Sequence, residues 1–181
     1  MQSILHTPIT ILFIALSCIA YFFQQKDEYF TSKYAMFGMQ VRRKEYYRLI
    51  TGAFLHGGIY HLIVNMLALY NLGSSLELYL GHIRFLLCLL ISIIGANLMV
   101  YFKERSTVMT VGMSGGIYGL MFIYFVILWS IGALANPGIR NSVLRTVIIN
   151  GFISFMPGIS MYGHLGGALT GIILGLLLMF I

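Results

Sequence analysis

Long apolar runs repeat along almost the whole chain, and they limit the possible folds more than any other feature. A helix that crosses a bilayer needs roughly 20 apolar residues. Hydrophobic residues make up 59% of the 181-residue chain and charged residues only 9%, which lies outside the range of soluble domains. The pattern predicts one membrane domain over residues 1–181, without a separate soluble domain, whose spans cover residues 9–23, 56–72, 83–102, 114–131, 142–156 and 161–181.

These spans are expected to be α-helices. An isolated segment in hydrocarbon must satisfy its own backbone polar groups, and the runs are too long and too uniformly apolar to be strands of a barrel. The predicted fold class is therefore an all-α membrane protein with six transmembrane helices. The first run lacks a basic flank and a small-residue cleavage site, so we expect it to be retained as a span.

The longest polar stretch, residues 24–48, combines charged with aromatic side chains. Tyr29, Phe30 and Tyr34 are interleaved with cations, which is typical of a segment at the membrane interface. Its longest basic run is Arg42-Arg43-Lys44, which is expected to anchor the loop near lipid headgroups. The net charge of +6 therefore predicts contact with the lipid bilayer and no nucleic-acid partner.

A serine surrounded by glycines stands where the fourth apolar run begins, in the segment Val111-Gly112-Met113-Ser114-Gly115-Gly116-Ile117-Tyr118-Gly119. At the start of a helix such a serine can present its hydroxyl with little steric cover, beside backbone N–H groups that have no helical partner. A nucleophile next to an oxyanion needs both properties. A flexible turn leading into a membrane helix is the alternative interpretation of these residues alone.

Two histidines and an asparagine open the second apolar run, as His56-x4-His61-x3-Asn65. Polar groups at membrane depth are costly and usually mark a functional site. His61 and Asn65 share a helix face because they are four residues apart. They can be metal ligands, can hydrogen-bond neighbouring helices, or can donate to a developing oxyanion. His56 and His61 are five residues apart and no H-E-x-x-H motif is present, so no metal and no cofactor is predicted.

A third histidine, His164, lies in the sixth run among glycines that recur every four residues, at Gly163, Gly167, Gly171 and Gly175. Such a face lets another helix approach closely. If the fourth run packs there, Ser114 comes within hydrogen-bond reach of His164. Tyr118 is one turn after Ser114 and can stack on the imidazole. No intramembrane Asp is available as a third member, so the pattern indicates a dyad. Taken alone, a histidine on such a face is more often an interior hydrogen-bonded group than a catalyst.

These motifs together resemble the rhomboid family of intramembrane serine proteases, and the similarity runs through nearly the whole chain as a minimal six-span core. The residues that carry it are His56-x4-His61-x3-Asn65, Gly112-x-Ser114-Gly115 followed by Tyr118, and His164-x-x-Gly167. The resemblance implies that Ser114 is the nucleophile and His164 the general base and acid. It also implies an oxyanion site made by His61, Asn65 and the Ser114 backbone N–H, with support from Gly112, Tyr118 and His56.

The resemblance has further implications for the rest of the chain. Tyr47-Arg48 stands where the family usually has Trp-Arg, which is a departure in the anchoring of the first loop. Glu77 is expected to be a structural hydrogen-bond acceptor. Residues 157–162 would cap the active site, and the fifth span would be the lateral gate for a substrate helix.

The predicted location is the plasma membrane of a prokaryote, with cytoplasmic termini and with transmembrane-helix proteins as substrates. Family topology places Arg84, Arg140 and Arg145 inside against eight cations outside, which is the reverse of the positive-inside tendency. We follow the family topology because the motifs are more specific than a charge count. No oligomeric state is predicted.

Two other functions are compatible with a polytopic chain of this kind. A catalytically silent relative would use the same fold to bind membrane helices, but it has no need of both Ser114 and His164. A small channel or transporter is disfavoured because the sequence has no internal repeat and no charged pathway.

Overall fold

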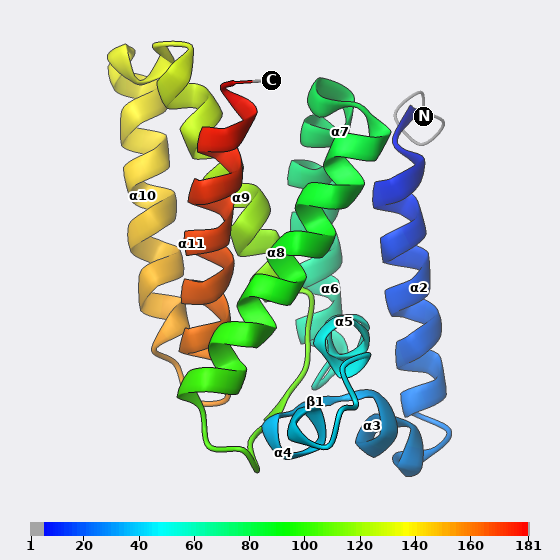
Figure 1. Ribbon diagram of the computed structural model, residues 1–181. Helices are drawn as coiled ribbons and strands as arrows, with labels where there is room; N and C mark the ends of the chain where they lie inside the picture. Colours follow the sequence, from blue (N-terminus) through cyan, green and yellow to red (C-terminus); the bar gives the residue numbers. More distant parts are fainter. Residues whose placement is uncertain (1–5, 181) are drawn as a thin grey trace.

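The computed structural model describes residues 6–180 as a bundle of helices (Figure 1). Its long helices are α2 (Pro8–Gln24), α6 (Ile59–Ala68), α7 (Ser74–Leu80), α8 (His82–Lys103), α9 (Ser114–Ser130), α10 (Pro137–Ser154) and α11 (Met161–Leu178). α2 and α10 lie at opposite edges of the bundle, and the start of α2 lies at the same end as the end of α11 (Figure 1). The predicted all-α membrane class is confirmed.

Two helices of the described residues are long and apolar enough to cross a membrane by themselves, α8 and α11. A third candidate is the pair Arg48–Phe54 and Ile59–Leu80, which is bent by 100°. α2 and α9 are apolar but shorter, with 17 residues each. The chain is thus an integral membrane protein, and the count of six spans stays a prediction.

The second apolar helix begins at Ile59, three residues later than predicted. The chain before it forms a 3-10 turn, η1 (Gly52–Phe54), and Gly58 then adopts an extended conformation with φ 169°. His56 consequently lies in the link between η1 and α6, not on the helix. The two glycines after His56 explain the late start, because glycine lowers helix propensity.

The same helix continues to Leu80 instead of ending at residue 72. It passes through a π-helical turn, η2 (Leu69–Gly73), and stops where Gly81 takes a positive φ of 79°. The polar residues in this part do not end the helix because their side chains bond back to its own carbonyls. The Asn71 amide, for example, donates to the Leu67 carbonyl oxygen at 2.8 Å.

α10 begins at Pro137, five residues before its predicted start, and ends at Ser154. The Asn136 side-chain oxygen accepts hydrogen bonds from the backbone of Gly138 at 2.8 Å and of Ile139 at 3.4 Å. The Asn-Pro-Gly cluster therefore caps a helix and does not extend the turn, with proline at the first helical position. Before it stands a short 3-10 turn, η3 (Ala133–Ala135). Ile181, the predicted end of the sixth span, lies outside the described residues.

The buried carboxylate of Glu77 fixes the start of α2. It accepts hydrogen bonds from the backbone N–H groups of Ile9 at 2.9 Å and Thr10 at 2.8 Å, and from the Thr10 hydroxyl at 2.7 Å. The first N–H groups of a helix have no intrahelical partner, and an anion is favourable there. Glu77 thus accepts structural hydrogen bonds that join α7 to α2.

The polar stretch after α2 folds into short elements at one end of the bundle, α3 (Glu28–Tyr34), α4 (Gly38–Arg42) and α5 (Arg48–Thr51) (Figure 1). Arg48 is buried and donates to the carbonyls of Ser32 at 2.8 Å and Ala35 at 2.7 Å. Tyr47 adds a bond from its hydroxyl to the Lys33 carbonyl at 3.2 Å. The Tyr-Arg pair therefore anchors this loop through carbonyl groups.

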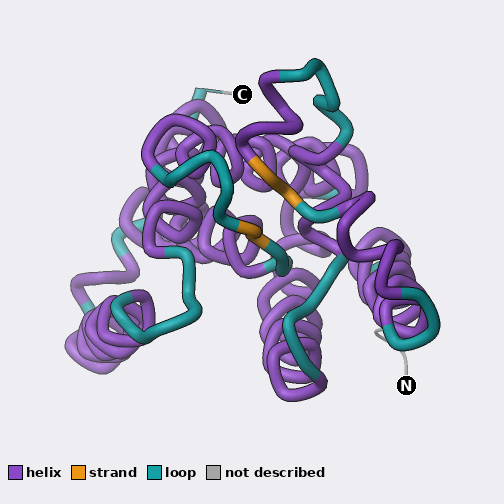
Figure 2. The backbone as a smooth tube through the Cα atoms, turned by 90° about the horizontal axis from the view of Figure 1, so that it is seen from below, coloured by secondary structure: helices purple, strands orange, loops and turns teal. Residues whose placement is uncertain are grey.

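A two-residue strand pair, which the sequence did not predict, joins this loop to the segment before Ser114. β1 (Met36–Phe37) pairs antiparallel with β2 (Met109–Thr110), and Figure 2 shows the two strands against the helix ends. Just after β2, the Gly112 N–H donates to the Gly52 carbonyl at 3.0 Å. These bonds hold the chain that leads into α9.

Candidate active site

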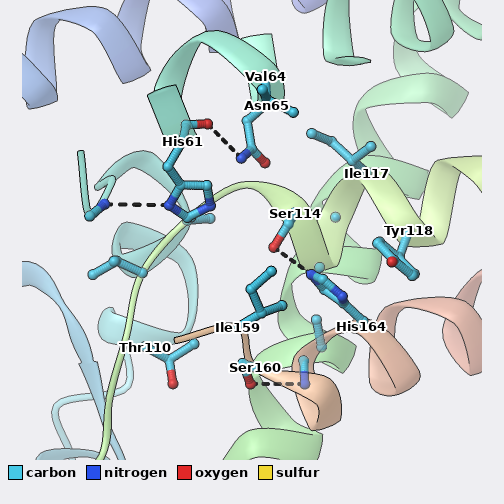
Figure 3. A pocket seen from close by; sticks show the side chains of 18 of the residues that line it. His61, Val64, Asn65, Thr110, Ser114, Ile117, Tyr118, Ile159, Ser160 and His164 are labelled. Atoms are coloured by element: carbon cyan, nitrogen blue, oxygen red, sulfur yellow. Dashed lines mark hydrogen bonds between the residues drawn. The ribbon is translucent and has the colours of Figure 1, made fainter. Parts of the chain in front are cut away.

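Ser114 and His164 meet across the interface of α9 and α11. Ser114 is the first residue of α9, and His164 lies in the first turn of α11. The Ser114 Oγ and the His164 Nε2 are 3.0 Å apart (Figure 3). His164 is buried, while Ser114 is half-buried and lines a cavity. The structure therefore brings together the two residues that the motifs singled out, which are fifty positions apart in the sequence.

Glycines allow this approach, because α9 and α11 touch backbone to backbone. A Cβ atom on Gly167 would overlap the carbonyl oxygen of Gly115, and one on Gly171 would overlap that of Gly119. Helices can approach so closely only where both present small residues. The small-residue face predicted in the sixth run is thus the surface that carries His164 to Ser114.

Tyr118 covers one face of the imidazole. Its ring stacks on that of His164 with 3.9 Å between the centroids and 15° between the planes. The Tyr118 hydroxyl points toward α10, where it donates to the Asn150 carbonyl at 2.7 Å and lies 2.9 Å from the Ser154 Oγ. One side chain therefore contacts both the imidazole and the neighbouring helix.

Ser154, on α10, is a partner of His164 that sequence analysis missed. Its Oγ lies 2.8 Å from the His164 Nδ1, and both side chains are buried. The signal in the sequence was the pair Asn150 and Ser154, two polar residues four positions apart that share a helix face. A serine in an apolar helix commonly bonds its own backbone, so this signal was weak.

His61 and Asn65 lie on α6 at the other side of Ser114, and both line the cavity (Figure 3). The Gly57 N–H donates to the His61 Nδ1 at 3.4 Å, which leaves the proton on Nε2. The Asn65 amide donates one proton to the His61 carbonyl at 2.8 Å and has a second N–H left. Each side chain therefore offers a donor to a group in the cavity.

Gly112 holds the segment before Ser114 against the His61 ring. Its φ of 119° is rarely adopted by residues with a side chain. A Cβ atom here would lie 2.7 Å from the His61 Cε1 and 2.9 Å from Nε2. Both the backbone and the space therefore require glycine at this position.

His56 stands behind His61 and is not among the residues that line the cavity. Its backbone N–H donates to the Gln24 side-chain oxygen at 2.9 Å, and its ring meets that of His61 edge to face with centroids 5.1 Å apart. Its Nδ1 lies 3.3 Å from the Phe54 carbonyl oxygen. His56 thus packs against His61 and connects it to α2.

The cavity that these side chains line has a volume of about 770 Å³. The connection between α10 and α11 borders it through Met156, Gly158, Ile159 and Ser160. Among its lining residues within the described chain there is no Asp, Glu, Lys or Arg. Its polar groups are neutral hydroxyls, imidazoles, amides and backbone N–H groups, among them those of the first turn of α9, which have no intrahelical partner.

The fold and the site define a class, that of helical membrane proteins with a serine–histidine pair in a cavity between their helices. The family model of the rhomboid domain matches residues 43–180. The chain belongs to the rhomboid family.

Several curated proteins are similar to this chain. RHOMBOID-like protein 4 of Arabidopsis thaliana is 36% identical over 142 residues, covering 77% of this chain and 36% of the relative. The putative rhomboid protease YdcA of Bacillus subtilis is 31% identical over 142 residues, covering 78% of this chain and 71% of the relative. The rhomboid protease GluP of the same bacterium is 31% identical over 169 residues, covering 90% and 33%.

The chain covers only 36% to 46% of the length of the first three Arabidopsis relatives. Since plant and bacterial proteins both match, a prokaryotic origin stays a prediction.

Proposed function

We propose that this protein is an intramembrane serine endopeptidase that hydrolyses peptide bonds in or near transmembrane helices. The observation that carries the proposal is the 3.0 Å contact between the Ser114 Oγ and the His164 Nε2 inside a cavity of a rhomboid-family membrane protein. A nucleophile and its base need this distance. The names of two relatives, YdcA and GluP, include the words rhomboid protease.

In the proposed reaction, the Ser114 Oγ attacks the scissile carbonyl carbon while the His164 Nε2 takes the hydroxyl proton. The tetrahedral intermediate then expels the amine, which receives the proton from Nε2, and an ester to Ser114 remains. Water attacks this acyl-enzyme by the same route, with its proton passing to Nε2, and releases the carboxylic acid and the free serine.

The oxyanion would be bound by the Ser114 backbone N–H, the His61 Nε2–H and the second N–H of Asn65. The side chains of His61 and Asn65 lie on one side of Ser114 and the imidazole of His164 on the other (Figure 3), which supports this proposal. Loss of one such donor costs on the order of 10²-fold in rate. Asn65→Ala is therefore expected to reduce kcat by that factor.

Access for the substrate follows from the bilayer. A carbonyl within an intact helix is hydrogen-bonded, so a substrate helix must unwind locally before the bond can be attacked. α10 would act as the lateral gate and residues 157–162 as the cap. The proposed setting is a prokaryotic plasma membrane with six spans and cytoplasmic termini.

The test is cleavage of a model transmembrane substrate in liposomes. Ser114→Ala protein is expected to fold and to be inert, whereas Ser130→Ala, at the other end of α9, keeps its activity. A fluorophosphonate is expected to label the wild-type protein at Ser114, because only an activated serine reacts. Undiminished cleavage by Ser114→Ala would overturn the proposal, and a folded wild-type protein that neither reacts nor cleaves would be a silent binder.

A further inference from the structure

We infer that Ser154 is a positioning residue for His164, and that it makes the tautomer of the catalytic imidazole depend on the position of α10. The inference rests on the proposed function. It starts from the 2.8 Å contact between the Ser154 Oγ and the His164 Nδ1, the ring nitrogen that faces away from Ser114. Both side chains are at least nine-tenths buried, with 7% and 5% exposure.

The protons of the network select one tautomer of His164. Four contacts connect His164, Ser154, Asn150 and Tyr118. The Ser154 Oγ contacts the His164 Nδ1 and, at 2.8 Å, the Asn150 carbonyl oxygen. The Tyr118 hydroxyl contacts the Ser154 Oγ at 2.9 Å and the Asn150 carbonyl oxygen at 2.7 Å. If Nδ1 carries a proton, that proton and those of the two hydroxyls fill three of the four contacts. If Nδ1 is bare, only the two hydroxyl protons are available.

The favoured tautomer is the one that the reaction needs. With its own proton donated to Asn150, Ser154 accepts from Nδ1–H, and Nε2 then presents its lone pair to the Ser114 hydroxyl. The other tautomer would place a proton on Nε2, which could no longer take one from Ser114. Orienting the imidazole and fixing its tautomer is the role of the aspartate in soluble triads. Here a neutral hydroxyl performs it, without a buried charge.

Ser154 belongs to α10, a helix that does not carry Ser114 and does not pack closely against α9 and α11. Glycines let α9 and α11 pack backbone to backbone, so the distance between Ser114 and His164 stays fixed. In α10, Ser154 is the buried residue, and the other side chains are exposed or half-buried. If α10 moves outward while α11 stays, Nδ1 loses its acceptor. The imidazole is therefore correctly protonated for catalysis only when α10 lies against α9 and α11.

The first experiment needs no variant. Long-range ¹H–¹⁵N NMR of histidine-labelled protein in micelles, with His164 assigned by its loss in His164→Ala, reports which ring nitrogen carries the proton. We expect Nδ1–H and a bare Nε2 in the neutral wild-type protein. A neutral His164 protonated on Nε2 would overturn the inference.

The second experiment compares Ser154→Ala with Ser154→Thr, which keeps the hydroxyl, and with Thr146→Ala as the matched control. Thr146 lies on the same helix and bonds its hydroxyl to the Ser142 carbonyl, away from the network. We expect Ser154→Ala to lower kcat and the fluorophosphonate reaction rate about tenfold, with little change in KM, and to give mixed tautomers. Ser154→Thr and Thr146→Ala should resemble the wild type.

Two outcomes separate this inference from the proposed function. If Ser114→Ala is inert but Ser154→Ala cleaves at the wild-type rate with an unchanged tautomer, the inference fails alone. If Ser114→Ala cleaves normally, the proposed function fails first. Should Ser154→Ala not fold, the wild-type tautomer still decides the question.

Discussion

The ring of Tyr118 lies flat against the imidazole of His164, with the two centroids 3.9 Å apart. Because the hydroxyl of the same tyrosine bonds to the backbone of Asn150, this side chain fixes both the imidazole and the helix opposite it. Stacking restricts the tilt of the imidazole, and the polar contacts at Ser154 restrict its rotation. His164 is thus held by groups without charge.

Substitutions of Tyr118 are expected to separate these two contributions. Tyr118→Phe keeps the stacked ring but loses one hydroxyl, so kcat should fall about two- to tenfold. Tyr118→Ala also loses the ring contact, whose value of about 0.5–1.5 kcal/mol corresponds to a further two- to tenfold. Steady-state cleavage gives both numbers, with Tyr124→Phe on the same helix as the control. Equal kcat for Tyr118→Ala and the wild type would contradict a role in holding the imidazole.

The pairing of Ser114 with His164 was predictable from the sequence because histidine is rare in the apolar runs and because glycines surround both residues. The glycines predicted a close contact between the fourth and sixth apolar runs, and such a contact brings Ser114 and His164 together. The spacing of His61 and Asn65 predicted that they share one helix face, and both line the cavity. In contrast, Ser154 was missed because a serine in an apolar helix commonly bonds a carbonyl of its own helix, as Ser154 also does with Asn150.

The fold was predictable as helical, but some boundaries were not. Hydropathy predicted an early end for the second helix, since it does not register that Glu77 is satisfied by the start of α2. The start of α10 was misjudged because Asn136 and Pro137 signal a turn and a helix cap alike. The strands at Met36 and Met109 are two residues long, which is too short for a period of two to appear.

Replacing Gly171 by alanine is expected to separate α9 from α11. The new Cβ would overlap the Gly119 carbonyl oxygen and lie 2.9 Å from the Gly119 Cα, and backbone cannot move aside as a flexible side chain can. Overpacking of this kind costs about 1–3 kcal/mol. Activity should fall as well, because the two helices carry Ser114 and His164 of the proposed dyad. Unfolding in mixed micelles measures the decrease in the free energy of unfolding, with Ile173→Ala on the exposed face of α11 as the control. A Gly171→Ala protein of unchanged stability would disprove the close contact.

The stability of the loop that follows α2 is expected to fall in acid because of Glu45. Its ion pair with Arg48, with 2.7 Å between Oε2 and Nε, lowers the pKa of this carboxyl, and the Tyr47 hydroxyl contributes in the same direction. The folded protein therefore binds the proton less readily than the unfolded chain. The stabilisation is complete above the unfolded pKa of about 4.3 and is lost as pH falls through the lower folded value. The Tm difference between wild type and Glu45→Gln should shrink over that interval; a constant difference would contradict this.

Gly112→Ala is expected to damage the site more than the fold. Its Cβ would lie 2.7 Å from the His61 Cε1, so either the His61 ring or the segment that leads to the Ser114 N–H must move. Both the His61 ring and the Ser114 N–H are donors of the proposed oxyanion site. The loss in kcat should approach 10²-fold, as for removal of one oxyanion donor. Gly132→Ala is the matched control, since Gly132 also has a positive φ, 71°, but open space around its Cβ position. Alanine in the left-handed α region, as at position 132, costs about 1–2 kcal/mol. The φ of 119° at Gly112 lies outside that region, so Gly132→Ala controls for a positive φ and not for the full strain at position 112. If the two variants lose activity equally, backbone strain and not that contact explains the effect.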